Sequence, residues 1–236
     1  MPDYVLGSAA PHINPDPGSG QWCSTLQTSK FLVYKRALEM AMDTHGVDIT
    51  VGVDAVKHMR HYLNNTGNDY LLDMPDLMKK SVQFKQKYEA DLALAQAFVS
   101  QLSDGQYALT SGKPGHGYFY RSQDINLFYA IGGYSFWGQG KVHIRTHSGV
   151  TSYLLDFEFY FYDRYNWDGG KSVTIANIKI TDEFMQKFHQ QCYAKEFDVR
   201  GVFKKKISWS KNTGADKTPP RPPQVAPANP FASLTK

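Results

Sequence analysis

Acidic and phenolic side chains gather at 159–171, where the aromatic run FYFY gives way to DRYNWDGGK. In an extended strand, alternate residues point to opposite faces, so the odd-numbered residues from Tyr153 onward form an apolar face and the even-numbered ones a polar face. Asp163 falls on the apolar side at the end of this strand. Because an unpaired buried charge is very costly, we expect its carboxylate to be paired, hydrogen-bonded or functional. Its candidate partners are Arg164, Lys171 and Arg200.

Three further residues follow Asp163 closely before a Gly-Gly pair: Tyr165, Trp167 and Asp168. A tight hairpin needs only the Asp-Gly-Gly end of this stretch for its turn. The additional residues therefore favour a general acid/base or metal-binding cluster, with Asp163 and Asp168 as the candidate ligands. The alternative is an ordinary turn whose amide groups satisfy Asp163.

Histidines that could serve this cluster are few. His189 lies on the predicted helix that follows the aspartate-rich turn, and that helix could return it to the end of the strand. We expect it to be the general acid/base, with an edge position on an amphipathic helix as the alternative. His58 and His61 share a face of an earlier predicted helix, but no third ligand is near them, so a solvated helix face is favoured over a metal site.

Two halves of different character would position the cluster. Apolar residues recur with helical spacing through 27–103, and β-branched and aromatic segments with glycine or polar breaks follow from Gln106. One helix, capped by Thr181, interrupts the second half. This segregation predicts the α+β class: a helical N-terminal half and a mostly antiparallel β-rich half, as an open barrel or strongly curved sheet with one helix inserted. The expected regions are an extended leader (1–26), a helical domain (27–104), a β-rich catalytic domain (105–210) and a disordered proline-rich tail (211–236).

Composition and charge exclude several classes of protein. The formal net charge of +4 is too small to argue for nucleic acid as a partner. Cys23 and Cys192 lie in different settings without C-x-x-C spacing, which argues against a disulfide framework and against structural zinc. The N-terminus lacks the basic and apolar regions of a Sec signal peptide, and no apolar stretch approaches the roughly 20 residues needed to cross a bilayer.

Three stretches, YAIGGYSFWGQGKV, YDRYNWDGGKSV and ITDEFMQKFHQQCYAKEFDVRG, together resemble a module of the polymorphic toxins of interbacterial competition. The order of parts also resembles, more distantly, the catalytic domain of colicin M. That bacteriocin family cuts the undecaprenyl-pyrophosphate linkage of lipid II in the periplasm, with a divalent cation, and carries an Asp-x-Tyr-Asp motif followed closely by His-Arg. Here Asp163-Arg164-Tyr165 matches the first three places and Asn166 stands at the fourth. The nearest following histidine is His189, which precedes a glutamine.

The resemblance implies a secreted antibacterial effector that hydrolyses a lipid-linked peptidoglycan precursor. Asp163 and Asp168 would hold Mg²⁺, which suits one or two carboxylates plus substrate phosphates, or would act as nucleophile or base. Tyr165 would orient the leaving group and His189 would transfer protons. Substrate contacts would come from Arg164, Trp167, Lys171 and Arg200.

The lack of a Sec-type signal predicts that the chain is made in the cytoplasm and exported by another route. The resemblance implies that it acts in the periplasm or envelope of the target cell. The resemblance also implies a cognate immunity protein in the producing cell. The composition of the proline-rich tail fits either a plain linker or a segment that docks to a secretion component or adaptor. Two alternatives remain open. One is a non-enzymatic, aromatic-rich module that binds a partner or forms a pore, and the other is an accessory protein of a secretion or phage-like particle.

Overall fold

The computed structural model of the chain describes residues 3–43, 51–167, 172–175 and 178–212. The helices are α1 (Ser29–Asp43), α3 (Val53–Leu63), α4 (Met74–Lys80), α5 (Val82–Val99), α6 (Ile125–Ala130) and α7 (Asp182–Gln190). The strands are β1 (Tyr4–Leu6), β2 (Tyr70–Leu71), β3 (Gly105–Ser111), β4 (Gly115–Tyr118), β5 (Gly133–His147), β6 (Val150–Tyr165), β7 (Ser172–Ile175), β8 (Ile178–Thr181) and β9 (Phe197–Asn212). The predicted tail from 213 onward, Asp168 and Lys171 lie outside the described residues.

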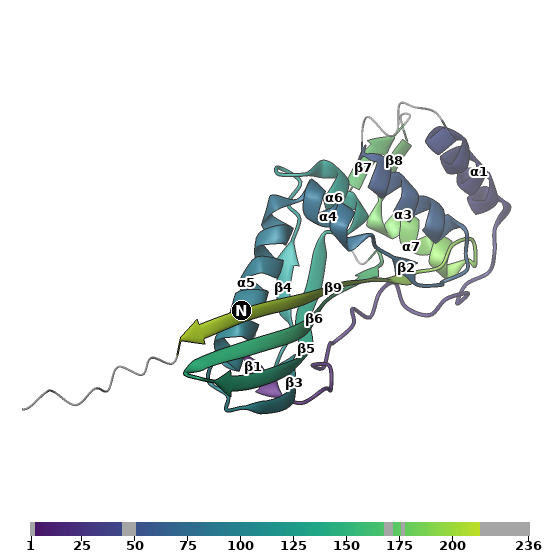
Figure 1. Ribbon diagram of the computed structural model, residues 1–236. Helices are drawn as coiled ribbons and strands as arrows, with labels where there is room; N and C mark the ends of the chain where they lie inside the picture. The colour runs from purple at the N-terminus through teal and green to yellow at the C-terminus, as the bar shows by residue number, and fades with distance from the viewer. Residues whose placement is uncertain (1–2, 44–50, 168–171, 176–177, 213–236) are drawn as a thin grey trace, which may run out of the picture.

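One sheet organises the molecule (Figure 1). Its strands follow the order β1-β3-β5-β6-β9-β2, and β4 pairs the first residues of β5 on the same edge as β3. All of these pairs are antiparallel except β2 with β9, and the sheet does not close on itself. Together with the six helices of the described residues, this arrangement confirms the predicted α+β class and the mostly antiparallel, open sheet.

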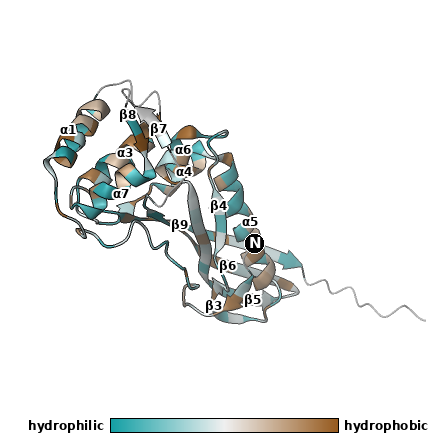
Figure 2. Cartoon of the chain, turned by 180° about the vertical axis from the view of Figure 1, so that it is seen from behind, coloured by the Kyte–Doolittle hydropathy of each residue, from teal (hydrophilic) through white to brown (hydrophobic). Residues whose placement is uncertain are grey.

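The long strand β6 shows the predicted alternation. Phe157, Phe159 and Phe161 are at most 1% exposed, whereas the residues between them face away from this core. On the buried side they meet α5: the rings of Phe84 and Phe159 lie 5.9 Å apart and those of Tyr88 and Phe159 5.5 Å apart. In Figure 2, α5 accordingly carries both apolar and polar residues.

The helical and β-rich regions contribute to a single core. Buried residues of α1, α3, α4 and α5 belong to the same apolar cluster as those of the sheet. The predicted boundary at 104/105 therefore marks a change of secondary structure within one packed unit. None of the described helices has the length and apolar character needed to span a membrane.

The start of α7 follows the predicted capping chemistry. The side chain of Thr181 accepts a hydrogen bond from the backbone N–H of Phe184 and so caps α7.

His58 on α3 does not lie on a solvated helix face as predicted. The residue is only 1% exposed, and its Nδ1 lies 2.5 Å from the carbonyl oxygen of Ala130. Burial lowers the pKa of His58 to about 4, so its ring is neutral and buried rather than part of a solvated face.

The leader is tied down at both ends. It begins as β1, paired with β3, and then runs past the sheet to α1 (Figure 1). A disulfide joins Cys23 to Cys192, with Cα atoms 4.6 Å apart, so the expectation of no disulfide was wrong. The two cysteines are separated by 169 positions, and only the docking of the leader against the end of α7 brings them together.

Backbone geometry permits this docking at one tight point. Gly18 adopts a φ of 68°, and a Cβ atom there would lie 2.2 Å from Oε2 of Glu196. Glycine is the residue that tolerates both the positive φ and the close approach. The next residue, Ser19, then donates its backbone N–H to Oε1 of Glu196 at 3.0 Å.

Candidate active site

A fork between β5 and β6 creates the main candidate site. The β5–β6 ladder ends at the pair Ser135–Tyr162, although β6 goes on pairing with β9 as far as Tyr165. Beyond this point β5 pairs only with β4. The two strands diverge, and a cavity of about 530 Å³ lies at the fork.

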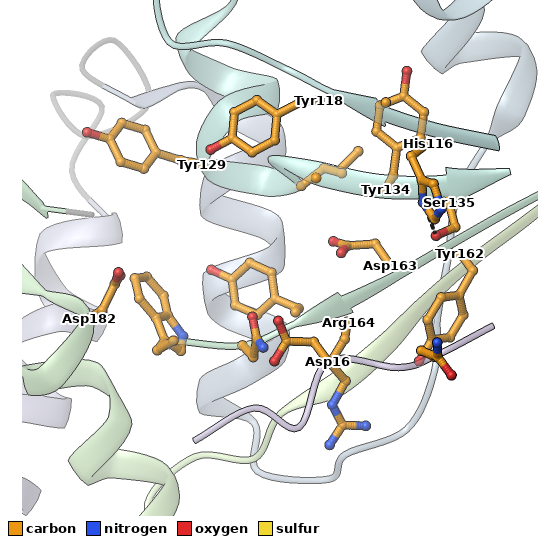
Figure 3. Close-up of a pocket in the computed structure, with 17 residues that line it drawn as sticks. Asp16, His116, Tyr118, Tyr129, Tyr134, Ser135, Tyr162, Asp163, Arg164 and Asp182 are labelled. Carbon is orange, nitrogen blue, oxygen red and sulfur yellow. Dashed lines mark hydrogen bonds between the residues drawn. The ribbon is translucent and has the colours of Figure 1, made fainter. Parts of the chain in front are cut away.

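Several parts of the chain line this cavity (Figure 3). The leader contributes Asp16, β4 contributes His116, α6 contributes Tyr129 and α7 contributes Asp182. Figure 3 shows Asp182 on one side of the view and the pair of His116 and Ser135 on the other. The end of β6 and the residues after it supply a continuous part of the wall, 162–167. The predicted residues Asp163, Arg164, Tyr165 and Trp167 therefore all reach one cavity.

Three carboxylates from different parts of the chain line this cavity, and one is Asp16 of the leader, which accepts the backbone N–H of Gly18 at 2.8 Å. Asp163 comes from β6, and Asp182 is the first residue of α7, where a negative charge is favoured by the helix dipole. Asp182 is only 2% exposed. Burial raises the pKa of Tyr165 far above its usual value, and the charges of Asp163 and Asp182 raise it further, so this phenol stays protonated. In the sequence, Asp182 is marked only by its place in the first turn of a predicted helix.

The arginines predicted to pair with Asp163 are engaged elsewhere. Arg164 donates from Nη1 to Oδ1 of Asp198 at 3.0 Å. Arg200 donates from Nη2 to the other oxygen of Asp198 at 2.6 Å and forms a second ion pair with Asp69 at 2.8 Å. Arg200 does not line the cavity, so the structure does not support its predicted contact with substrate.

The predicted general acid/base, His189, is not part of the cavity wall. Its Nδ1 accepts the backbone N–H of Glu196 at 3.2 Å, which leaves Nε2 protonated to donate to the carbonyl oxygen of Gly20 at 3.1 Å. The ring is 3% exposed. Helix α7 turns this histidine toward the leader and the start of β9, so its position fits a structural role and not the expected proton transfer.

Another histidine does reach the cavity. His116 on β4 is exposed, and its Nδ1 lies 3.1 Å from the hydroxyl oxygen of Ser135, its cross-strand neighbour (Figure 3). Among the described residues it is the only histidine in the cavity wall. Its segment, KPGHGYFYR, carries glycines that indicate bends in a sheet, and nothing in the sequence links it to Asp163.

The donor chemistry of the cavity is compatible with a hard cation. Carboxylate oxygens are the ligands that Mg²⁺ uses, and Asp163 and Asp182 supply them. Among the residues that the structure describes, no group of three or more His, Cys, Asp or Glu side chains is placed to hold a metal ion. Asp168, the second predicted ligand, lies outside those residues.

Comparison with known proteins gives structural likeness alone. No protein-family model matches the chain, and no curated protein matches it. One similar solved structure is PaeM, a colicin M-like bacteriocin produced by Pseudomonas aeruginosa, with 14% identity and a TM-score of 0.33 over 67% of this chain and 51% of that one. Another is truncated bacteriocin syringacin M from Pseudomonas syringae pv. tomato, with 10% identity and a TM-score of 0.30 over 67% of this chain and 60% of that one. The chain thus matches between half and three fifths of the length of these two proteins.

Proposed function

We propose that this protein is an antibacterial effector that hydrolyses a phosphoester or pyrophosphate of the cell envelope, in a lipid-linked peptidoglycan precursor, within the cavity at the β5–β6 fork. One observation carries the proposal: Asp163 of β6 and Asp182 of α7 line a single cavity together with Tyr165. The resemblance of Asp163-Arg164-Tyr165 to a bacteriocin motif supports the same reaction class.

Each side chain has a role that its position permits. Asp163 accepts a proton from the attacking water, whose oxygen forms the new bond to phosphorus. The bond from phosphorus to the leaving oxygen breaks, and His116, the histidine of the cavity wall, returns a proton to that oxygen. Tyr165 remains a neutral phenol beside the reacting group. Asp182, together with phosphate oxygens of the substrate, would hold Mg²⁺, which when bound would neutralise charge on those oxygens.

The partners and compartment follow from this activity. A toxin of this kind requires a cognate immunity protein in the producing cell, and it acts in the periplasm or envelope of the target. The Cys23–Cys192 disulfide suits an oxidising compartment outside the cytoplasm. The proline-rich segment beyond the described residues would dock to a secretion component or adaptor.

The test is expression in a susceptible bacterium, directed either to the periplasm or to the cytoplasm. We expect lysis from the periplasm only, with release of the products of a lipid-linked wall precursor. Asp163→Asn and Asp182→Asn should each abolish lysis. Asp156→Asn is the matched control, because Asp156 lies on the same strand but is 56% exposed and pairs with Lys206. Absence of toxicity in both compartments contradicts the proposal.

A second function is favoured by the aromatic lining of the cavity. Tyr118, Tyr129, Tyr134 and Trp167 surround the carboxylates, and such side chains also suit the binding of a sugar, a lipid headgroup or a protein. Toxicity that survives the double change Asp163→Asn and Asp182→Asn would favour this binding or pore-forming role over hydrolysis.

A further inference from the structure

Three neighbouring residues at and just after the end of β6 hold buried N–H groups for which the described part of the chain offers no acceptor. The atoms are Nε of Arg164, Nδ2 of Asn166 and Nε1 of Trp167, and no hydrogen-bond partner for them exists among the described residues. All three residues line the cavity at the fork. Native proteins leave few buried donors unsatisfied, because each one destabilises the folded state. A cluster of three within four positions therefore calls for a physical explanation.

The three atoms share one chemical property. A guanidinium N–H, an amide NH₂ and an indole N–H all donate hydrogen bonds, and none of these nitrogens accepts one. A ligand that satisfies them must present several acceptor oxygens close together. The cation of Arg164 favours a negatively charged ligand over a neutral one.

The side chains and backbone around these donors are held in place by other contacts. The Nη1 atom of Arg164 is bound to Asp198 at 3.0 Å and its Nη2 lies 4.0 Å from Oε2 of Glu196, while Nε has no partner within the described ranges. The carbonyl oxygen of Trp167 accepts the hydroxyl of Ser19 at 3.2 Å. Asn166 lies between these anchored neighbours, and the broad terminal torsion of its amide lets Nδ2 turn toward an acceptor that enters the cavity.

We propose that Arg164, Asn166 and Trp167 form a subsite for a phosphoryl oxyanion. A phosphoryl group carries enough acceptor oxygens to serve all three donors, and the cavity of about 530 Å³ has room for a diphosphate. The carboxylates of Asp163 and Asp182 repel an anion that enters alone, so binding is strengthened by a divalent cation. This subsite deepens the proposed function by naming the residues that hold the ground-state phosphoryl group, and among these Asn166 had no predicted role.

The indole N–H groups provide a direct test. In a titration of the ¹⁵N-labelled protein with inorganic pyrophosphate, with and without MgCl₂, we expect the Nε1–H resonance of Trp167 to move saturably. Trp137 is the internal control, because its Nε1 is also buried without a partner among the described residues, yet it stacks on Tyr160 and does not line the cavity. The subsite is wrong if Trp167 does not move, or if Trp137 moves equally.

Two substitutions separate hydrogen bonding from packing. Trp167→Phe keeps an aromatic ring and removes the donor, and we expect about 10-fold weaker pyrophosphate binding, the loss of one hydrogen bond to a charged ligand. Asn166→Asp replaces the amide donor by a carboxylate, which has the same sign of charge as pyrophosphate. It should weaken binding more than Trp167→Phe does. Trp137→Phe should leave affinity unchanged. Wild-type affinity in both Trp167→Phe and Asn166→Asp overturns the inference.

Binding and turnover distinguish this inference from the proposed function. If pyrophosphate shifts Trp167 but no envelope phosphoester is hydrolysed, the subsite stands and the hydrolytic function fails. If hydrolysis occurs while Trp167 stays unmoved by pyrophosphate, the function stands and the subsite fails. Sulfate at matched concentration tests selectivity, since a weaker shift is expected from an ion of lower charge.

Discussion

The carboxylate of Asp91 accepts a hydrogen bond of 2.9 Å from the phenol of Tyr4, and this contact ties the edge strand β1 to helix α5 inside the core. Asp91 is 0% exposed and Tyr4 7% exposed. Burial raises the pKa of Asp91 to about 6, although the hydrogen bond from Tyr4 acts in the opposite direction. An acidic group in this position makes the stability of the fold depend on pH.

The first prediction concerns that dependence. Because the folded-state pKa of Asp91 lies above its unfolded value, its contribution is fully present below about pH 4 and is lost as pH rises through about 6. Asp91→Asn, which keeps the acceptor for Tyr4, should therefore be more stable than the wild type above pH 7, by up to about 3 kcal/mol. Urea unfolding at pH 4, 6 and 8 measures this difference. A gap that does not change with pH would contradict the assignment.

The second prediction distinguishes the two histidines near the site. His116→Asn should lower kcat by about 100-fold or more, since a general acid contributes typically that much, and it should leave the unfolding free energy nearly unchanged. His143→Asn is the matched control, because His143 is an exposed histidine of β5 outside the cavity wall. Equal activity of the His116 and His143 variants would remove His116 from the mechanism.

The third prediction is that substitution of His189 lowers the stability of the fold and leaves kcat unchanged, the opposite of the effect expected for His116. Both of its ring nitrogens bond to backbone groups, at Glu196 and Gly20. His189→Leu should leave a buried N–H and a buried carbonyl unsatisfied and should cost about 1–3 kcal/mol of stability for each. The fraction that remains folded should keep wild-type kcat. A large loss of kcat in a fully folded variant would show that His189 takes part in catalysis, as the sequence predicted.

The fourth prediction concerns the disulfide. Replacing Cys23 and Cys192 by serine should lower the free energy of unfolding by about 2–5 kcal/mol, as for other native disulfides. It should also expose the leader to protease ahead of the rest of the chain. Limited proteolysis with and without reductant measures the rate at which the leader is cleaved. The serine double variant is the control, because its cleavage rate should not change with reductant. Equal cleavage of oxidised and reduced wild-type protein would count against the disulfide as the anchor of the leader.

Local patterns in the sequence predicted local structure well. The alternation along 153–163 correctly placed the aromatic face of β6 in the core, and Thr181 caps α7 as expected. These features depend on neighbouring residues, so periodicity and capping chemistry are enough to recognise them. The segregation of helices and strands likewise gave the correct fold class.

The composition of the site could not be predicted in the same way, because it depends on the pairing of strands and the packing of helices that local sequence patterns do not reveal. The β5–β6 ladder stops at Ser135–Tyr162, and this stop both opens the cavity and brings His116 to it. Asp182 and His189 are seven positions apart and so lie on nearly the same face of α7, and the first turn of the helix meets the cavity, so Asp182, and not His189, enters its wall. Either residue fits an amphipathic helix, so periodicity alone could not choose between them.

The leader has a consequence for the order in which the cavity is completed during synthesis. Asp16 belongs to the cavity wall, yet the contacts that hold the leader beside it are made with residues near 189–196, among them His189, Cys192 and Glu196. During synthesis, the residues around Asp16 emerge from the ribosome long before His189, Cys192 and Glu196 do. That wall of the cavity therefore forms late, and a chain truncated before Cys192 lacks it whatever else has folded.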